Sequence, residues 1–124
     1  MPPKKILVVD DEPEVRDLME HFLADKGFEV RAAENGRLGL KVLETFTPDL
    51  VLLDMHMPEL DGVGTLRELA RRWPALPVIM VTVNEDVETT ARLLQLGAAD
   101  YVPKPFDLDY LEQAISIQLS AARG

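Results

Sequence analysis

Residues 6–12 read ILVVDDE, a short apolar run that ends in three acidic side chains. Related stretches recur as LVLLD at 50–54, VIMVT at 78–82 and DYVPKPF at 100–106. The apolar runs in the first three are rich in branched residues, do not alternate with polar residues and are too short for helices. Such runs are typical of parallel strands that are covered on both faces. We therefore predict buried strands, each with a polar residue where the strand ends.

Helical patterns lie between these strands. Phe28–Ala33 and Ala99–Val102 are weaker strand candidates, and Gly27 and Gly97 are predicted to end the first and fourth helices. Apolar residues at helical spacing mark five helices: Val15, Leu18, Met19, Phe22 and Leu23; Leu40, Leu43 and Phe46; Leu66, Leu69 and Trp73; Val87, Ala91 and Leu94; and Leu108, Leu111, Ile115 and Leu119. Five alternations of strand and helix predict an α/β fold. For this size we expect a flavodoxin-like, doubly wound, five-stranded parallel sheet in the order 2-1-3-4-5 with five helices.

Length and charge limit the classes of function. The 124 residues form one predicted domain, 1–124, with a core from about residue 4 to 121, and no composition break divides it. With 22 acidic against 13 basic residues, the net charge of −9 argues against direct nucleic-acid binding by this domain. The chain has no cysteine, and its first residues match neither a signal peptide nor a membrane span, so we expect a cytoplasmic protein.

Five polar side chains are predicted to meet at one edge of the sheet: Asp10, Asp11, Asp54, Thr82 and Lys104. The first and third strands flank the point where a sheet of this order opens a crevice. Acidic side chains gathered there need a counterion, and oxygen ligands without histidine or cysteine at ligand spacing favour Mg²⁺. For Asp11 and Glu12 the alternative interpretation is capping of the first helix, in which Pro13 suits the first turn.

Asp54 has two interpretations. It either ends a strand before a turn, given Pro58 and Gly62, or acts as a nucleophile that forms an aspartyl phosphate beside a metal ion. Three carboxylates would balance one Mg²⁺ and Lys104, and a phosphoryl group of roughly −1.5 to −2 charge would upset that balance. The hydroxyl of Thr82 could then hydrogen-bond a phosphoryl oxygen.

With these residues the chain resembles a receiver domain of a two-component response regulator, specifically a chemotaxis-regulator-like one. The resemblance runs from Lys4 to about Leu119 through the segments VVDDE, LLDMHMPELDG, IMVT and LGAADYVPKPF. It implies a phosphorylation-dependent signalling module in which Asp54 is the phosphoacceptor. Asp10, Asp11, Asp54 and the Met55 carbonyl would contact Mg²⁺, and Thr82 and Lys104 would bind the phosphoryl group. It also implies a cis peptide bond between Lys104 and Pro105.

Neighbouring positions are predicted to tune the switch. By resemblance Tyr101 changes rotamer together with Thr82, although it could equally be a half-buried strand aromatic. Val83 is bulkier than the small residue usual after the family threonine, and our hypothesis is that it slows arrival or hydrolysis of the phosphoryl group. The other two variable positions are His56, interpreted mainly as a solvated loop residue, and Asn84. We interpret His21, on the first helix, as structural.

The resemblance also implies partners. The phosphodonor would be a phosphohistidine on a sensor histidine kinase or a histidine phosphotransfer protein. The fourth helix, last strand and last helix would contact an output domain or form a homodimer. Ile117 on the last helix either belongs to that surface or is buried by a tilted helix.

Three other classes of function also involve an acidic residue or a ligand at the end of a strand in an α/β fold. A pseudo-receiver would act as a protein-interaction domain without phosphorylation. A Mg²⁺-dependent phosphohydrolase of the haloacid dehalogenase type needs a second Asp two residues after the nucleophile, where this chain has His56. A flavodoxin-like electron carrier needs a first loop that binds phosphate, whereas DDEPE would repel one.

Overall fold

The structure is a computed structural model that describes residues 3–55, 62–83 and 87–121. Within these residues strands and helices alternate, as predicted. The strands are β1 (Lys5–Val9), β2 (Glu29–Ala33), β3 (Leu50–Leu53), β4 (Val78–Val83) and β5 (Asp100–Lys104). The helices are α1 (Pro13–Asp25), α2 (Gly36–Val42), α3 (Gly62–Arg72), α4 (Val87–Gln95) and α5 (Leu108–Ala121).

The strands form one parallel sheet in the order β2-β1-β3-β4-β5, which confirms the predicted order. Val9 pairs with Leu53 at the end of the central strand pair, so the residues that follow each strand leave the sheet at the same level. Val83 pairs with Lys104 at the same edge. The register thus gathers the carboxyl ends of four strands at one edge of the sheet.

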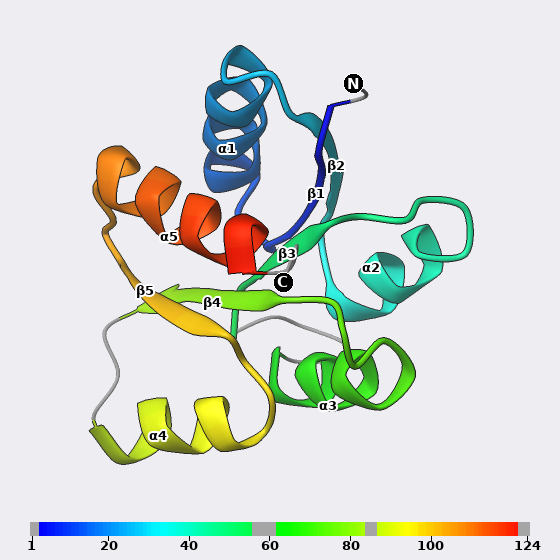
Figure 1. The fold of residues 1–124 in the computed structure, drawn as a ribbon, viewed down its shortest axis with the longest axis vertical. Coiled ribbons are helices and arrows are strands. Elements are labelled where there is room, and N and C mark those ends of the chain that lie inside the picture. Colours follow the sequence, from blue (N-terminus) through cyan, green and yellow to red (C-terminus); the bar gives the residue numbers. More distant parts are fainter. Residues whose placement is uncertain (1–2, 56–61, 84–86, 122–124) are drawn as a thin grey trace.

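Helices cover both faces of the sheet. In Figure 1, α1 and α5 lie on one side of the strands, and α2, α3 and α4 lie on the other. Alternate strand residues point to opposite faces, so Ile6 and Val8 pack with α1 and α5, whereas Leu7 and Val9 pack with the other layer. Burial on both faces explains why β1, β3 and β4 carry continuous apolar runs.

The predicted second helix is shorter than expected, and some of the apolar residues that mark the first and fourth helices face away from the core. Phe46 lies beyond the end of α2, because the chain tightens into turns after Val42, and it is buried as a loop residue. Val87 and Ala91 on α4 are exposed, since this helix turns Leu93 toward the core instead. On α1, Leu18 is also exposed, whereas its neighbour Met19 is buried.

The opposite edge of the sheet, where β3 and β4 begin, carries an apolar hollow of about 460 Å³. Trp73 follows the last residue of α3 and lines this hollow together with Phe46 and Pro48. The guanidinium carbon of Arg72 lies 4.5 Å from the centre of the Trp73 ring.

Candidate functional site

The ends of β1, β3, β4 and β5 bring four of the predicted side chains to one edge. Asp10 directly follows β1 and Asp54 directly follows β3, while Thr82 and Lys104 belong to β4 and β5. The backbone N–H of Asp54 donates to the Val9 carbonyl at 2.9 Å, which ties the two strand ends together. Asp10 and Asp54 are only 2% and 4% exposed, so two carboxylates are buried side by side.

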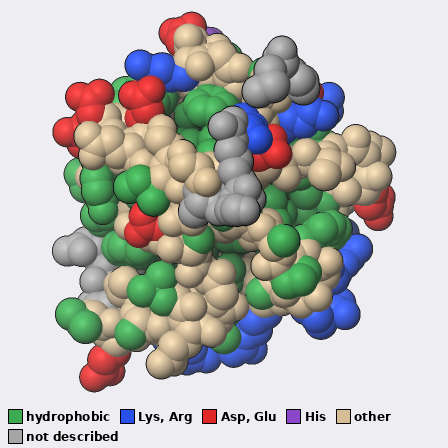
Figure 2. Space-filling view, viewed as in Figure 1, with side chains coloured by type: hydrophobic (Ala, Val, Ile, Leu, Met, Phe, Trp, Pro, Cys, Tyr) green, Lys and Arg blue, Asp and Glu red, His purple; other side chains and the backbone are tan. Residues whose placement is uncertain are grey.

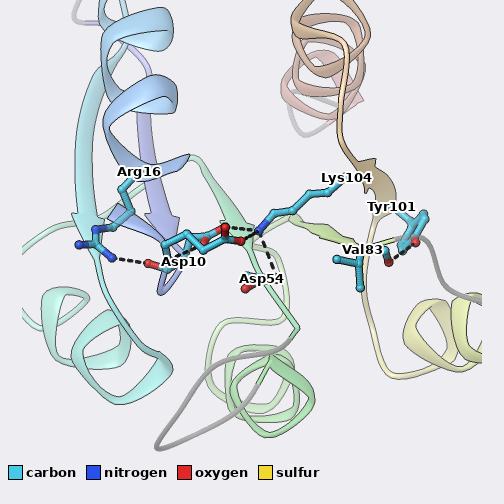
Figure 3. A network of polar contacts seen from close by, with 7 residues as sticks. Asp10, Arg16, Asp54, Val83, Tyr101 and Lys104 are labelled. Atoms are coloured by element: carbon cyan, nitrogen blue, oxygen red, sulfur yellow. Dashed lines mark hydrogen bonds and ion pairs between the residues drawn. The ribbon is translucent and has the colours of Figure 1, made fainter. Parts of the chain in front are cut away.

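Lys104 is the cation that joins these carboxylates. Its Nζ lies 2.8 Å from Asp10 Oδ2, 3.1 Å from Glu12 Oε1 and 3.7 Å from Asp54 Oδ1. Figure 3 shows the lysine side chain reaching from β5 across the edge of the sheet to the acidic residues. One ammonium thus serves three carboxylates, and the site keeps a negative charge that can attract a cation.

The pKa of Lys104 is raised above its ordinary value. Burial is the largest single influence and lowers this pKa, because it disfavours the charged ammonium. The hydrogen bond to Asp10, the charges of Asp10 and Asp54 and the hydrogen bond to Glu12 together outweigh burial. Lys104 is therefore a permanent cation at neutral pH.

Glu12 lies at the start of α1, as the capping interpretation requires, but its side chain does not cap the helix. It is the N-cap residue of α1, but its side chain makes no capping hydrogen bond and pairs with Lys104 instead. The Glu12 N–H donates to Asp10 Oδ1 at 2.9 Å. Carboxylate oxygens of Asp10, Asp11 and Glu12 lie within 4.8 Å of one another, which is a grouping that could hold a metal ion.

Thr82 and Tyr101 occupy the neighbouring strand ends. Thr82 is fully buried, and its Oγ1 has no hydrogen-bond partner within the part of the chain that the structure describes. A buried hydroxyl without a partner is unfavourable and marks a place where a ligand atom could bind. The Tyr101 hydroxyl donates to the Val83 carbonyl at 3.0 Å (Figure 3), and Val83 itself is half exposed at the end of β4.

The backbone after β3 is closely covered. The Met55 carbonyl accepts the Gly62 N–H at 2.9 Å and, having two lone pairs, can also contact a cation. A Cβ at position 62 would lie 2.3 Å from Met55 Cα and 2.4 Å from the Asp54 carbonyl oxygen. Only glycine fits there, so the start of α3 lies directly against the backbone of the candidate site.

The remaining predicted residues lie at the margins or outside the site. His56 and Asn84 fall outside the described residues. The peptide bond between Lys104 and Pro105 is cis, the isomer that the resemblance implies. His21 is exposed on α1, with Nδ1 2.8 Å from the Asp17 carbonyl oxygen, and takes no part in the site.

Sequence reasoning missed one residue beside the site and misjudged another. Arg16 donates from Nη1 to the Asp10 carbonyl at 2.7 Å, and Glu12 is a partner of Lys104. Only its place in the sequence could have indicated Arg16, because it lies in the first turns of a helix that begins at the acidic cluster. Arg16 contacts a backbone carbonyl, which every residue has, so no pattern of residue types predicts this contact.

Chemically, the arrangement offers a buried carboxylate beside a lysine ammonium, oxygen ligands for a hard cation and the buried hydroxyl of Thr82. These are the parts needed to bind a phosphoryl group and neutralise its charge.

None of the helices in the described ranges is long and apolar enough to span a membrane.

Comparisons with known proteins agree with this geometry. The family model of the response regulator receiver domain matches residues 6–116. The regulatory protein AtoC of Escherichia coli (strain K12) is 43% identical over 118 residues, covering 92% of this chain and 26% of AtoC. The transcriptional regulator NtrC of the same strain is 41% identical over 115 residues, covering 90% of this chain and 24% of NtrC. The chain thus spans about a quarter of the length of these relatives.

Solved structures give the same result. A CheY-like response regulator receiver domain protein from Methanospirillum hungatei JF-1 superimposes with a TM-score of 0.92 at 30% identity, covering 98% of this chain and 97% of that one. The fold and the family match thus extend over nearly the whole chain. The chain therefore belongs to the response regulator receiver domain family, the signalling modules of two-component systems.

Proposed function

We propose that Asp54 accepts a phosphoryl group and that Thr82 and Lys104 bind it. The observation that carries this proposal is the position of Lys104, whose ammonium lies 3.7 Å from the buried Asp54 and 2.8 Å from the buried Asp10. A fixed cation beside a buried carboxylate can neutralise charge that develops on an incoming phosphoryl group. The buried Thr82 hydroxyl, which has no hydrogen-bond partner among the described residues, supports a place for one of the phosphoryl oxygens.

The donor set fits Mg²⁺. Asp10, Asp11, Asp54 and the Met55 carbonyl would hold the ion, because all of them offer the hard oxygen ligands that it prefers. When bound, Mg²⁺ would supply positive charge for the phosphoryl oxygens. Lys104 would add the second cationic contact from the side of β5.

The transfer step involves one bond made and one broken. A carboxylate oxygen of Asp54 forms an O–P bond while the P–N bond of a phosphohistidine donor breaks. The electron pair of that P–N bond leaves with the imidazole nitrogen. Hydrolysis of the resulting acyl phosphate by water restores Asp54 and releases inorganic phosphate. The domain would thus promote its own phosphorylation and dephosphorylation while serving as a switch.

The output would be a changed surface on α4, β5 and α5. Figure 2 shows hydrophobic side chains at the surface over α4, in the lower left of the view. Val87 is 85% exposed on α4, and Ile117 is 63% exposed on α5, which favours the surface role over burial in a tilted helix. We propose that Tyr101 links this surface to the site, because its hydroxyl contacts Val83 next to Thr82.

The partners follow from this role. A sensor histidine kinase or a histidine phosphotransfer protein would supply the phosphoryl group in the cytoplasm. An output domain or a second copy of the chain would contact α4, β5 and α5.

We propose that residues 1–124 form a single receiver domain. The net charge of −9 disfavours direct DNA contact by this domain, even if a longer protein binds DNA.

Phosphorylation by acetyl phosphate tests the proposal. We expect a single phosphoryl adduct by intact-mass measurement, dependent on Mg²⁺ and absent from Asp54→Asn. Asp49→Asn is the matched control, because Asp49 lies just before the other end of β3 and an amide oxygen can still accept the Lys5 N–H. No adduct in the wild type would favour a pseudo-receiver, and steady turnover of phosphate esters would favour a hydrolase.

A further inference from the structure

Arg16 makes a contact with the site that the proposed chemistry does not use. It is the fourth residue of α1, and its Nη1 donates to the backbone carbonyl of Asp10 at 2.7 Å. Figure 3 shows the guanidinium on the side of Asp10 away from Lys104. The bond spans six residues and closes the loop that carries Asp11 and Glu12.

This bond completes a full set of contacts around Asp10. The Asp10 N–H donates to the Ala33 carbonyl at 3.1 Å, Oδ1 accepts the Glu12 N–H at 2.9 Å and Oδ2 accepts Lys104 at 2.8 Å. The carbonyl is the remaining polar atom, and Arg16 fixes it. Because the Asp10 carbonyl and the Asp11 N–H belong to one planar peptide unit, fixing that carbonyl also fixes the direction in which the chain enters Asp11.

We infer that Arg16 is a positioning residue for the divalent-cation site, in that its bond to the Asp10 carbonyl holds the peptide from which Asp11 projects. The inference rests on the proposed function, because it assumes that Asp10 and Asp11 hold Mg²⁺. Arginine suits this role, since its guanidinium stays charged and offers several N–H donors in a rigid plane.

The formal charges of the site allow a sharp test. Asp10, Asp11, Glu12 and Asp54 carry four negative charges, and Lys104 and Arg16 carry two positive ones, which leaves −2 for one divalent cation to balance. If Arg16 acted only through its charge, its removal would make the site more negative and tighten Mg²⁺ binding. If Arg16 positions the ligands, its removal weakens binding. The two roles predict changes of opposite sign.

Loss of Arg16 leaves no hole in the core. Its side chain is only half buried and belongs to neither apolar core cluster, and it lines an open hollow of about 570 Å³ beside Ala33 and Lys41. A methionine at this position keeps the apolar stem while removing the donors and the charge. We therefore expect Arg16→Met to fold.

The experiment is a titration of the full chain with MgCl₂ in the absence of any phosphodonor. Amide NMR spectra recorded at each step measure the Mg²⁺ affinity. In Arg16→Met we expect Mg²⁺ binding to weaken roughly 10-fold, the scale seen when groups that orient metal ligands are lost. We also expect the Asp11 amide nitrogen signal to shift before any metal is added, because its peptide carbonyl has lost a hydrogen bond. Arg92→Met on α4 is the control for charge and should leave both measurements unchanged.

The outcomes separate this inference from the proposed function. A wild type that binds no Mg²⁺ contradicts the proposed function, and the inference with it. A wild type that binds Mg²⁺, beside an Arg16→Met variant of equal or tighter affinity, contradicts the role of Arg16 alone. Arg16→Gln, whose amide is too short to reach the carbonyl, is judged by the same criterion should the methionine variant not fold.

Discussion

Lys104 shows how much one buried cation can contribute. Its side chain is 10% exposed and serves three carboxylates that would otherwise repel one another. Breaking a buried ion pair by removing one partner costs about 3 to 5 kcal/mol, because a buried charge is left uncompensated. Lys104 therefore stabilises the resting fold as well as taking part in the proposed chemistry.

The raised pKa of Lys104 gives this contribution a pH dependence. In Mg²⁺-free buffer we expect Lys104→Met to lower the free energy of unfolding by about 3 kcal/mol at neutral pH. Since the folded pKa exceeds the unfolded value of about 10.4, the contribution is complete below that value and is lost as pH rises through the folded pKa. Urea unfolding of both proteins at a series of pH values measures the difference, and a gap that persists far into the alkaline range would refute the expectation.

The side chain of Val83 is predicted to restrict access to the proposed phosphoryl site. It pairs with Lys104 in the sheet register, and its side chain is half exposed beside the proposed phosphoryl site. If it restricts access, Val83→Ala should lower the barrier for adduct formation or hydrolysis by about 1 kcal/mol, roughly a fivefold faster rate.

A time course of phosphorylation by acetyl phosphate and of adduct loss after its removal measures both rates. Val83→Thr, which keeps the branched shape, is the matched control and should behave as the wild type. Unchanged rates in Val83→Ala would rule out the steric role.

At the scale of elements, short α2 depends on its cap. Asn35 is buried, and its side-chain oxygen accepts the Leu38 N–H at 2.9 Å. We expect Asn35→Ala to lower the free energy of unfolding by about 1 kcal/mol, because an N–H at the helix start loses its partner. Asn35→Ser should keep most of the stability, since serine is also a good cap, and urea unfolding compares the three proteins. Equal losses in both variants would argue against the capping contribution.

Some features of the strands and helices could be predicted from sequence patterns, and others could not. β1, β3 and β4 were predictable because burial on both faces leaves an apolar run, as in Leu50–Leu53. The buried face of α4 was not predictable, since Val87, Ala91 and Leu94 have correct helical spacing and yet are exposed. Periodicity identifies a helix and its faces, but which face is covered depends on neighbours that are distant in sequence.

At the scale of the whole molecule, strand order carries most of the prediction of the site. Once the strands are parallel, their carboxyl ends share an edge, and the convergence of Asp10, Asp54, Thr82 and Lys104 follows. The contacts of Arg16 and Glu12 do not follow, because they depend on where α1 begins relative to the sheet. Side chains at strand ends can thus be foreseen from sequence, whereas partners that reach in from a helix need coordinates.

Trp73 has a practical consequence for work on this protein. It is the one tryptophan in the chain, and it lies at the edge where β3 and β4 begin, opposite the acidic residues. Its intrinsic fluorescence should therefore report the loss of packing during denaturation while staying insensitive to what is bound near Asp54. Trp73 fluorescence can therefore be used to compare the stability of the protein with and without a ligand bound near Asp54.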